Sequence, residues 1–271
     1  RPFTQGLERL LKRVSKATDV IFPRRTGVTV LIYHRVGGGS DSQVDMSVAD
    51  FERHLAHLAE HANVVTLDDA VAMLAAGHDS DPQVVITFDD GTADFTDHAV
   101  PALVRHGLPA TLYAATKFVD EQTDFPWEAP PTSWPALRDA VGTGLITIGS
   151  HTHSHWLLDR LDPAAIADDL DRSIELISTH VGRPPRHFAY PKALPGSPQA
   201  EIAVRRRFAS AALAASRVNR PGRTDLHRLW RTPIQRSDGF EFFTAKAAGG
   251  LRLEGELRAA VARVKYRGST R

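Results

Sequence analysis

The stretch Gln83–Gly91, QVVITFDDG, joins an apolar run to a polar turn, and it decides the fold class. Its first part, Gln83–Phe88, is rich in β-branched residues, as is typical of a strand buried on both faces of a parallel sheet. Two other stretches, Val28–His34 (VTVLIYH) and Leu145–His151 (LITIGSH), have the same form and also end in polar side chains. The three stretches therefore predict parallel strands that carry polar groups at their carboxyl ends.

Strands and helices alternate along the rest of the chain. Further short apolar runs predict strands at Asn63–Leu67, Ala110–Ala115, His187–Pro191, Ala209–Leu213 and Leu229–Ile234. Helical spacing and cap residues predict helices after Ser47, over Asp68–Ala76, Trp134–Val141 and Asp162–Val181, and from Leu251 to about Tyr266. Ser47 and Asp162 are expected as N-caps, and Gly182 as the residue that ends its helix. This alternation predicts an α/β fold with a parallel sheet or barrel, formed by one domain over residues 28–271.

The composition excludes several classes of site and partner. The net charge of +1 gives no field that would attract nucleic acid, so we expect no such partner. The chain has no cysteine, which excludes disulfides, thiolate metal sites and cysteine nucleophiles. With 13 histidines available, a metal site in this chain would use His, Asp and Glu side chains.

The first 27 residues form a basic extension that has two interpretations. Apolar residues at roughly helical spacing lie there beside arginines and lysines: Leu7, Leu10, Leu11, Val14 and Ile21. Such a helix can lie on a membrane surface, or it can pack on the outside of the barrel, which we favour. The sequence shows no signal peptide and no membrane-spanning run, so we expect a cytoplasmic or membrane-peripheral protein. Because the first residue is Arg1 and not Met, export stays open.

Asp89 and Asp90 are adjacent carboxylates at the end of a predicted strand. Such neighbours repel each other unless a cation or a proton relieves the repulsion. Gly91 allows the tight turn that would aim both side chains. An ordinary Asp-Asp-Gly turn without a function is the alternative.

The stretch Ser150–His155, SHTHSH, supplies a second polar cluster. His151 and His155 are four residues apart, so one helical turn would place both imidazoles on one side, with His153 pointing elsewhere. Two histidines and one carboxylate make a three-ligand site that leaves positions open for water and substrate. The alternative is a solvated histidine-rich loop. Since both clusters follow strands in a βα pattern, we expect them to meet at one barrel mouth.

A proline-rich loop is expected over residues 120–135. It carries Trp127 and Trp134, two residues that could stack on a sugar ring. The alternative is that they cover the edge of the core.

Taken together, these motifs resemble the polysaccharide deacetylase family, carbohydrate esterase family four. The quoted stretches are TFDDG at Thr87–Gly91, the His151-Thr152 pair followed by His155, and the segments LIYHRV, FERHL and ITIGSHTHSH. The likeness covers about Val28–Ala193 well and continues weakly to about Asp238. It implies a distorted barrel of about seven βα units that hydrolyses the acetamide of a hexosamine.

The resemblance also implies roles for residues. Asp89 would be the catalytic base, and Asp90, His151 and His155 would hold a divalent metal, usually Zn²⁺, although Co²⁺, Ni²⁺ or Fe²⁺ would also suit. A histidine after the first strand is the general acid in the poly-N-acetylglucosamine deacetylase branch, and His34 matches it. A buried histidine bonded to backbone is the alternative for that position.

The third motif departs from the usual Arg-Pro-Pro-Tyr. The chain has Phe188–Ala193, FAYPKA, so Ala189 stands where the arginine that orients the base would be. The resemblance then offers Arg231, in an Arg-x-Pro strand, as the replacement, and an exposed strand-end residue is the alternative. Lys192, through its backbone N–H, and Tyr190 are expected at the oxyanion and substrate.

The expected function is therefore the removal of an N-acetyl group from an N-acetylhexosamine in a glycan or glycolipid, with release of acetate. Two alternatives stay open. One is another metal-dependent amidohydrolase, such as a deformylase, on the same site. The other is a non-catalytic carbohydrate-binding protein, which would have no need of the paired carboxylates and the histidines.

Overall fold

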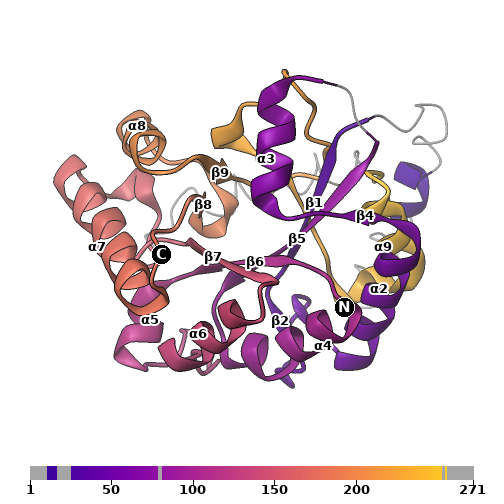
Figure 1. Cartoon of the computed structure of the whole chain (residues 1–271), viewed down its shortest axis with the longest axis horizontal. Coiled ribbons are helices and arrows are strands. Elements are labelled where there is room, and N and C mark those ends of the chain that lie inside the picture. The colour runs from indigo at the N-terminus through magenta and orange to yellow at the C-terminus, as the bar shows by residue number, and fades with distance from the viewer. Residues whose placement is uncertain (1–10, 17–25, 79–80, 252–253, 255–271) are drawn as a thin grey trace.

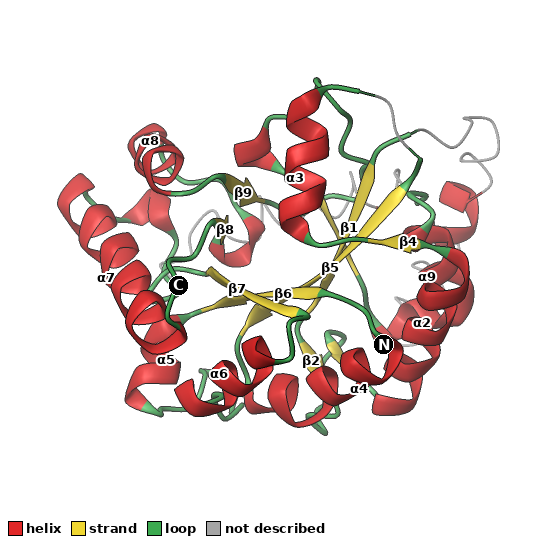
Figure 2. Cartoon of the chain, viewed as in Figure 1, coloured by secondary structure: helices red, strands yellow, loops and turns green. Residues whose placement is uncertain are grey.

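A computed structural model of the chain describes residues 11–16, 26–78, 81–251 and 254. Seven parallel strands form the wall of a nearly closed barrel, and helices surround it (Figure 1, Figure 2). In spatial order they are β10 (Arg231–Pro233), β1 (Val28–Tyr33), β5 (Gln83–Asp90), β6 (Ala110–Ala114), β7 (Ile146–Ser150), β8 (His187–Ala189) and β9 (Ser210–Ala212). A parallel bridge between Ala212 and Leu229 brings the two ends of this path together. The distorted α/β barrel expected from the sequence is confirmed.

Within the part of the chain that the structure describes, helices α2 to α9 cover the wall. They are α2 (Val48–His61), α3 (Leu67–Ala76), α4 (Val100–His106), α5 (Thr116–Glu121), α6 (Trp134–Gly142), α7 (Pro163–Val181), α8 (Pro198–Arg207) and α9 (Gly239–Ala247). Shorter elements are β2 (Arg35–Val36), β3 (Asp45–Met46), β4 (Asn63–Val64), η1 (Phe95–Ala99), η2 (Leu158–Arg160), η3 (Pro191–Ala193), η4 (Leu226–Arg228) and η5 (Arg236–Asp238). None of the described helices is both long and apolar enough to span a bilayer.

The predicted helix caps are confirmed, and each has a clear physical cause. The hydroxyl of Ser47 accepts the backbone N–H of Asp50 at 3.1 Å at the start of α2. The carboxylate of Asp162 accepts two N–H groups at the start of α7. Gly182 ends that helix with a φ of 86°, a left-handed conformation that glycine adopts without strain.

Strand β5 is apolar along most of its length because it is covered on both sides. Ile86 and Phe88 pack outward into the core between the wall and the helices, whereas Val85 packs inward with Val30 of β1. Side chains alternate along a strand, so odd-numbered residues of β5 face the inside of the barrel. By this parity, the polar side chains of Thr87 and Asp89 face the inside of the barrel.

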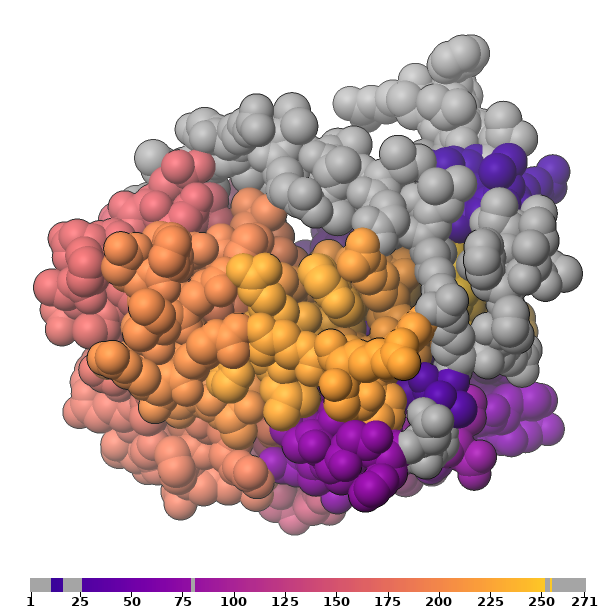
Figure 3. Space-filling view, turned by 90° about the horizontal axis from the view of Figure 1, so that it is seen from above, coloured from indigo at the N-terminus to yellow at the C-terminus, as the bar shows by residue number. Residues whose placement is uncertain are grey.

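Late segments of the chain lie against early ones and close the barrel. Seen from above, orange and yellow residues from the last third cover the middle of the face and lie beside violet residues of α3 (Figure 3). One contact there is a hydrogen bond of 3.0 Å from the N–H of Gly222 to the carbonyl of Leu74. The α3 helix thus packs beside the segment around Gly222, which is about 150 residues away in sequence.

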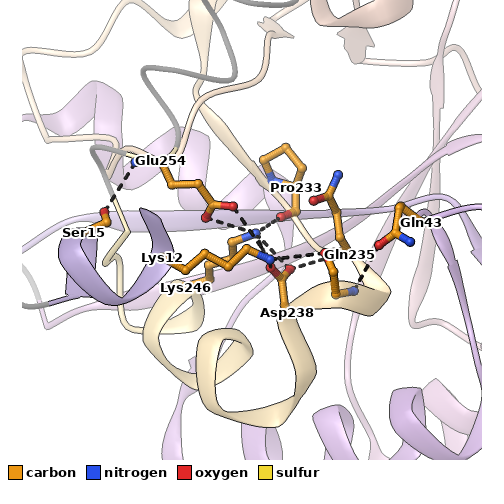
Figure 4. A network of polar contacts seen from close by, with 9 residues as sticks. Lys12, Ser15, Gln43, Pro233, Gln235, Asp238, Lys246 and Glu254 are labelled. Carbon is orange, nitrogen blue, oxygen red and sulfur yellow. Dashed lines mark hydrogen bonds and ion pairs between the residues drawn. The ribbon is translucent and has the colours of Figure 1, made fainter. Parts of the chain in front are cut away.

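A buried ionic cluster ties residues near both ends of the chain to the barrel (Figure 4). The ammonium of Lys12 lies 2.6 Å from Asp238, and that of Lys246 lies 2.8 Å from the same carboxylate. Glu254 lies 3.8 Å from Lys12 and 3.7 Å from Lys246, and all four side chains are at most 1% exposed. Lys246 also donates to the carbonyl of Pro233 in β10 at 2.8 Å. Two cations and two anions therefore neutralise one another inside the fold.

This cluster bears on the predicted N-terminal extension. Residues 11–16 pack against the barrel through Lys12 and Ser15, which are both buried, while Val14 is 47% exposed. In this segment the buried residues are thus polar, and the apolar spacing does not mark the packed side. Most of the predicted extension, with Leu7, Leu10 and Ile21, and the predicted C-terminal helix after Glu254 lie outside the described residues.

We expect Lys12→Met to lower the free energy of unfolding by about 3 kcal/mol, because removing one member of a buried charge cluster leaves an uncompensated anion. Lys16→Met is the matched control, since Lys16 is on the same turn of helix but pairs with Glu241 in solvent. Urea unfolding of both variants measures the difference. Equal midpoints for the two variants would contradict the prediction.

Candidate metal and catalytic site

Asp90, His151 and His155 converge at the carboxyl ends of β5 and β7. The Oδ1 of Asp90 lies 3.3 Å from Nε2 of His155 and 3.6 Å from Nε2 of His151. One ligand atom from each residue lies within 4.8 Å of the others, and all three side chains are buried. The structure thus brings together the three residues that the sequence suggested as metal ligands.

The expected helical turn between the two histidines is wrong. Residues 151–157 are irregular, and Thr152 and His155 have left-handed φ values of 68° and 60°. The backbone N–H of His155 donates to the hydroxyl of Thr152 at 2.8 Å, which folds the loop back on itself. The carboxylate of Asp169 in α7 accepts the N–H groups of His153 and Ser154. These loop bonds, and not a helix, turn His151 and His155 toward Asp90.

His153 faces away from this cluster. Its Nδ1 lies 3.0 Å from the hydroxyl of Thr116 at the start of α5. Its backbone carbonyl also accepts the N–H of Lys117 at 3.0 Å. The middle histidine therefore fastens the loop to α5.

His151 is held in one tautomer. Its Nδ1 lies 2.8 Å from the carbonyl oxygen of Ala189, which can only accept, so Nδ1 carries the hydrogen and Nε2 keeps its lone pair. Burial lowers the pKa of His151 to about 4, although Asp89 opposes this shift. The imidazole is therefore neutral near pH 7, as a metal ligand must be.

Asp89 forms a buried, two-pronged ion pair with Arg231. The Nη1–Oδ1 distance is 2.6 Å and the Nη2–Oδ2 distance is 2.8 Å, and the Arg231 side chain is fully buried. The guanidinium also lies over the ring of Tyr113, 4.9 Å from its centre. Burial alone would raise the pKa of Asp89, but the guanidinium of Arg231 together with the fields of His151 and His34 lowers that pKa overall. The structure therefore places Arg231 beside Asp89, and the exposed strand-end alternative is wrong.

The two aspartates escape the repulsion of neighbouring carboxylates in different ways. Asp89 follows the inward parity of β5, whereas Asp90 departs from the extended conformation with a φ of 76°. Burial favours protonation of Asp90, but the hydrogen bond and field of His155 lower its pKa overall. The backbone strain at Asp90 therefore separates two anions that have different partners.

His34 follows β1 at the same mouth. It is half-buried, and its field lowers the pKa of both Asp89 and Asp90, which places it near the pair. Within the described part of the chain, its Nδ1 is buried without a hydrogen-bond partner. The structure therefore has no hydrogen bond from the Nδ1 of His34 to the described backbone, which was the alternative for this residue.

Of the two residues expected at the oxyanion and substrate, Tyr190 lies elsewhere, whereas the role of the Lys192 backbone N–H stays a prediction. The Tyr190 side chain is 1% exposed and packs edge-on against Phe188 in a core cluster with residues of α7 and α8, so it does not reach the site. Lys192 and Ala193 both have a φ of 54°, and the two hydrogen bonds of this turn use the N–H groups of Ala193 and Leu194. The backbone N–H of Lys192 is used by neither bond.

The two tryptophans of the 120–135 loop have separate roles. Trp134 is buried in the main core at the start of α6. The Trp127 ring lies 5.8 Å from that of His155, stacks on Phe125 and carries the ammonium of Lys192 at 5.2 Å from its centre. Trp127 thus lines the site, and Trp134 does not.

Sequence reasoning missed the groups that hold the site residues. Thr87 accepts from Arg231 at 3.3 Å and donates to the carbonyl of Leu31 at 2.7 Å. Asp169 anchors the histidine loop, as described above. The inward parity of β5 could have identified Thr87, but no local signal marks Asp169, because it reads as an ordinary helix surface residue.

The donor set fits a divalent cation. Two imidazoles and one carboxylate are the ligands of open catalytic sites, and they leave positions for water and substrate. Asp90 is held ionised and His151 is held neutral, so both have the protonation state that ligation requires. Among the described residues, this is the one group of three that could hold a metal ion.

Comparisons with known proteins agree with this site. Residues 76–204 match the family model for polysaccharide deacetylase. The Bacillus subtilis (strain 168) protein YxkH, which bears a polysaccharide deacetylase name, is 27% identical over 165 residues, or 60% of this chain and 55% of that protein. A poly-beta-1,6-N-acetyl-D-glucosamine N-deacetylase of Staphylococcus aureus (strain MSSA476) is 27% identical over 158 residues, or 55% of this chain and 54% of that enzyme.

A solved structure extends the likeness to most of the barrel. The structure of IcaB from Ammonifex degensii has a TM-score of 0.72 at 26% identity, and the match covers 83% of this chain and 98% of that one. The chain spans little more than half the length of the two sequence relatives. The segment matched by the family model contains Asp89, Asp90, His151 and His155. Residues 76–204 thus resemble the polysaccharide deacetylase family, and the barrel around them has the fold of the IcaB structure.

Proposed function

We propose that this chain is a metal-dependent N-deacetylase that hydrolyses the acetamide of an N-acetylhexosamine in a glycan and releases acetate. The observation that carries this proposal is the buried Asp89–Arg231 pair beside the Asp90, His151 and His155 cluster. A polymer of N-acetylglucosamine is the substrate class we favour, because the Staphylococcus aureus relative is named for that polymer. The same chemistry on a lipid-linked amino sugar is the variant that the test below separates.

We assign Asp90, His151 and His155 as the ligands of the metal, most simply Zn²⁺. A divalent ion bound there polarises a carbonyl and acidifies water. Co²⁺, Ni²⁺ or Fe²⁺ would use the same donors, since nitrogen and oxygen ligands do not exclude them. The hydrogen bond from Nδ1 of His151 to Ala189 supports this assignment, because it directs Nε2 to the cluster.

In this proposal Asp89 is the general base. Arg231 occupies one lone pair on each of its oxygens, so each oxygen keeps a second lone pair for the proton of the attacking water. The guanidinium keeps Asp89 ionised and fixes the plane of its carboxylate. The base is thus ready before the substrate arrives.

His34 and Lys192 complete the assignment. His34 would deliver a proton to the departing nitrogen, and its unpartnered Nδ1 supports a role toward substrate. The backbone N–H of Lys192 would donate to the oxyanion. Because the Tyr190 side chain is buried in the core, we assign it no contact with substrate.

Acetate release tests the function directly. We expect the purified protein, loaded with Zn²⁺ or Co²⁺, to release acetate from oligomers or polymers of N-acetylglucosamine, and lipid-linked N-acetylhexosamines form the second arm. Formate release from N-formylated analogues without acetate release would favour the other amidohydrolase. Binding of the oligomers without any turnover would favour the carbohydrate-binding module.

Metal binding should depend on His151 and His155 but not on His153. His151→Ala and His155→Ala each remove a ligand, so each should weaken metal binding by more than the roughly 10–100-fold that loss of a supporting contact costs. His153→Ala is the matched control, since it lies in the same loop and faces Thr116. Calorimetric titration with Zn²⁺ measures all three. Loss of the metal in His153→Ala with retention in His155→Ala would overturn the ligand assignment.

Arg231→Met should lower turnover and move the acidic limb of the pH–rate profile upward. The sign follows because the guanidinium holds the pKa of Asp89 down against burial, and the base works only when ionised. Asp89→Asn should lose about 10²–10⁴-fold in turnover, and Arg231→Met should add little in that background. Arg228→Met, which breaks an exposed pair with Glu201, is the control. An unmoved acidic limb, or losses that simply add, would contradict the pairing.

A further inference from the structure

One buried carboxylate fastens the loop after β1 to the loop after β5. Asp94, which is 7% exposed, accepts from Nε of Arg35 at 2.9 Å and from the N–H of Val36 at 3.2 Å. On the β5 side, the hydroxyl of Thr92 donates to the same carboxylate at 3.0 Å. We call this set of four residues, Arg35, Val36, Thr92 and Asp94, the clasp.

The guanidinium of Arg35 is held from a second side. Its Nη2 donates to the carbonyl of Gly38 at 3.2 Å, and its Nη1 lies 3.8 Å from the carboxylate of Asp45. Asp45 in turn accepts the N–H groups of Gly38 and Ser40 at 3.0 and 2.8 Å. A Cβ on Gly38 would lie 2.2 Å from Nη2 of Arg35, so any other residue there would force the guanidinium to shift. The arginine is therefore fixed within its loop as well as to Asp94.

The clasp joins the two segments that carry the residues assigned to acid and base. His34 immediately precedes Arg35, and Asp89 and Asp90 come shortly before Thr92. The Nδ1 of His34 has no hydrogen-bond partner among the described residues, so no bond from that nitrogen fixes the ring. The place of the imidazole then depends on its backbone, which is set by β1 on one side and by the clasp on the other.

We propose that the clasp is a positioning element that sets the distance between His34 and the Asp89–Asp90 pair. This inference rests on the proposed function, in which His34 delivers a proton to the leaving nitrogen. Loosening the clasp then impairs that proton transfer and spares the attack of water. A clasp that only stabilised the fold would impair both steps alike.

Asp94→Asn separates the two cases, since it keeps the shape of the side chain and removes the charge that holds Arg35. We expect turnover of an N-acetylglucosamine oligomer to fall about 10–100-fold, because small misplacement of a catalytic group costs that much. Hydrolysis of 4-nitrophenyl acetate should fall no more than about threefold, because its leaving group needs no proton. In a His34→Ala background, Asp94→Asn should have little further effect on the amide.

Thr92→Val is the second variant, since it removes one bond of the clasp and leaves the buried Arg35–Asp94 pair intact. It should show the same preference for the amide with a smaller loss, and it decides the matter if Asp94→Asn does not fold. Arg207→Met, which breaks a pair with Asp171 between α8 and α7, should change neither substrate. Metal content and unfolding midpoint are measured for each variant.

Equal losses on amide and ester, or losses that add to those of His34→Ala, would overturn the inference and leave the deacetylase standing. If the wild-type protein released no acetate from any N-acetylated sugar, the proposed function would fail, and the inference with it. The two failures are thus distinct results.

Discussion

The ion pair between Asp89 and Arg231 is the constraint on which the rest of the structure depends. Both side chains are buried, and taking two charges out of water costs several kcal/mol per ion, so neither can be buried without the other. The pair joins β5 to β10, which are not neighbours, because β1 lies between them: Val30 pairs with Val85 on one side and with Arg231 on the other. The last strand must therefore dock in register on β1 before Asp89 has its partner. Closing the barrel and completing the site are one event, and the Thr87 hydroxyl and the Tyr113 ring line the place that Arg231 enters.

Features that depend on local chemistry could be predicted from the sequence. Apolar runs predicted the strands. Ser47, Asp162 and Gly182 predicted helix ends, because capping uses groups that lie within a few residues of one another. The two adjacent carboxylates after a strand predicted the centre of the site, because that signal also lies within a few residues of sequence. The partnership of Arg231 with Asp89 was different: 142 residues separate the two, and only the resemblance to a family suggested it.

Features that depend on distant partners or on unusual backbone could not be predicted. The spacing of His151 and His155 is compatible with a helical turn, but the loop reaches the same convergence through left-handed residues, one of which is the β-branched Thr152, a residue type that rarely adopts that conformation. A lysine such as Lys12 is normally expected in solvent, yet Lys12 is buried and its charge is neutralised by Asp238 and Glu254 inside the fold. Proximity to a motif was also misleading for Tyr190, which lies in the third motif although its side chain packs into the core.

The charges of the site indicate what Arg231 would add to Asp89 in the proposed function. Asp89 and Arg231 cancel, and ligating imidazoles are neutral, so Asp90 leaves the chain's own groups with one net negative charge around the cluster. In the proposed function, Asp90, His151 and His155 would hold a divalent cation that keeps a net positive charge, and such a charge would stabilise an oxyanion in a buried site. Without Arg231 the same groups would carry two negative charges, and the cation would be fully neutralised. Ala189 leaves no local cation in the third motif, so the charge has to come from β10. The closing strand of the barrel therefore sets the charge of the site as well as the orientation of Asp89.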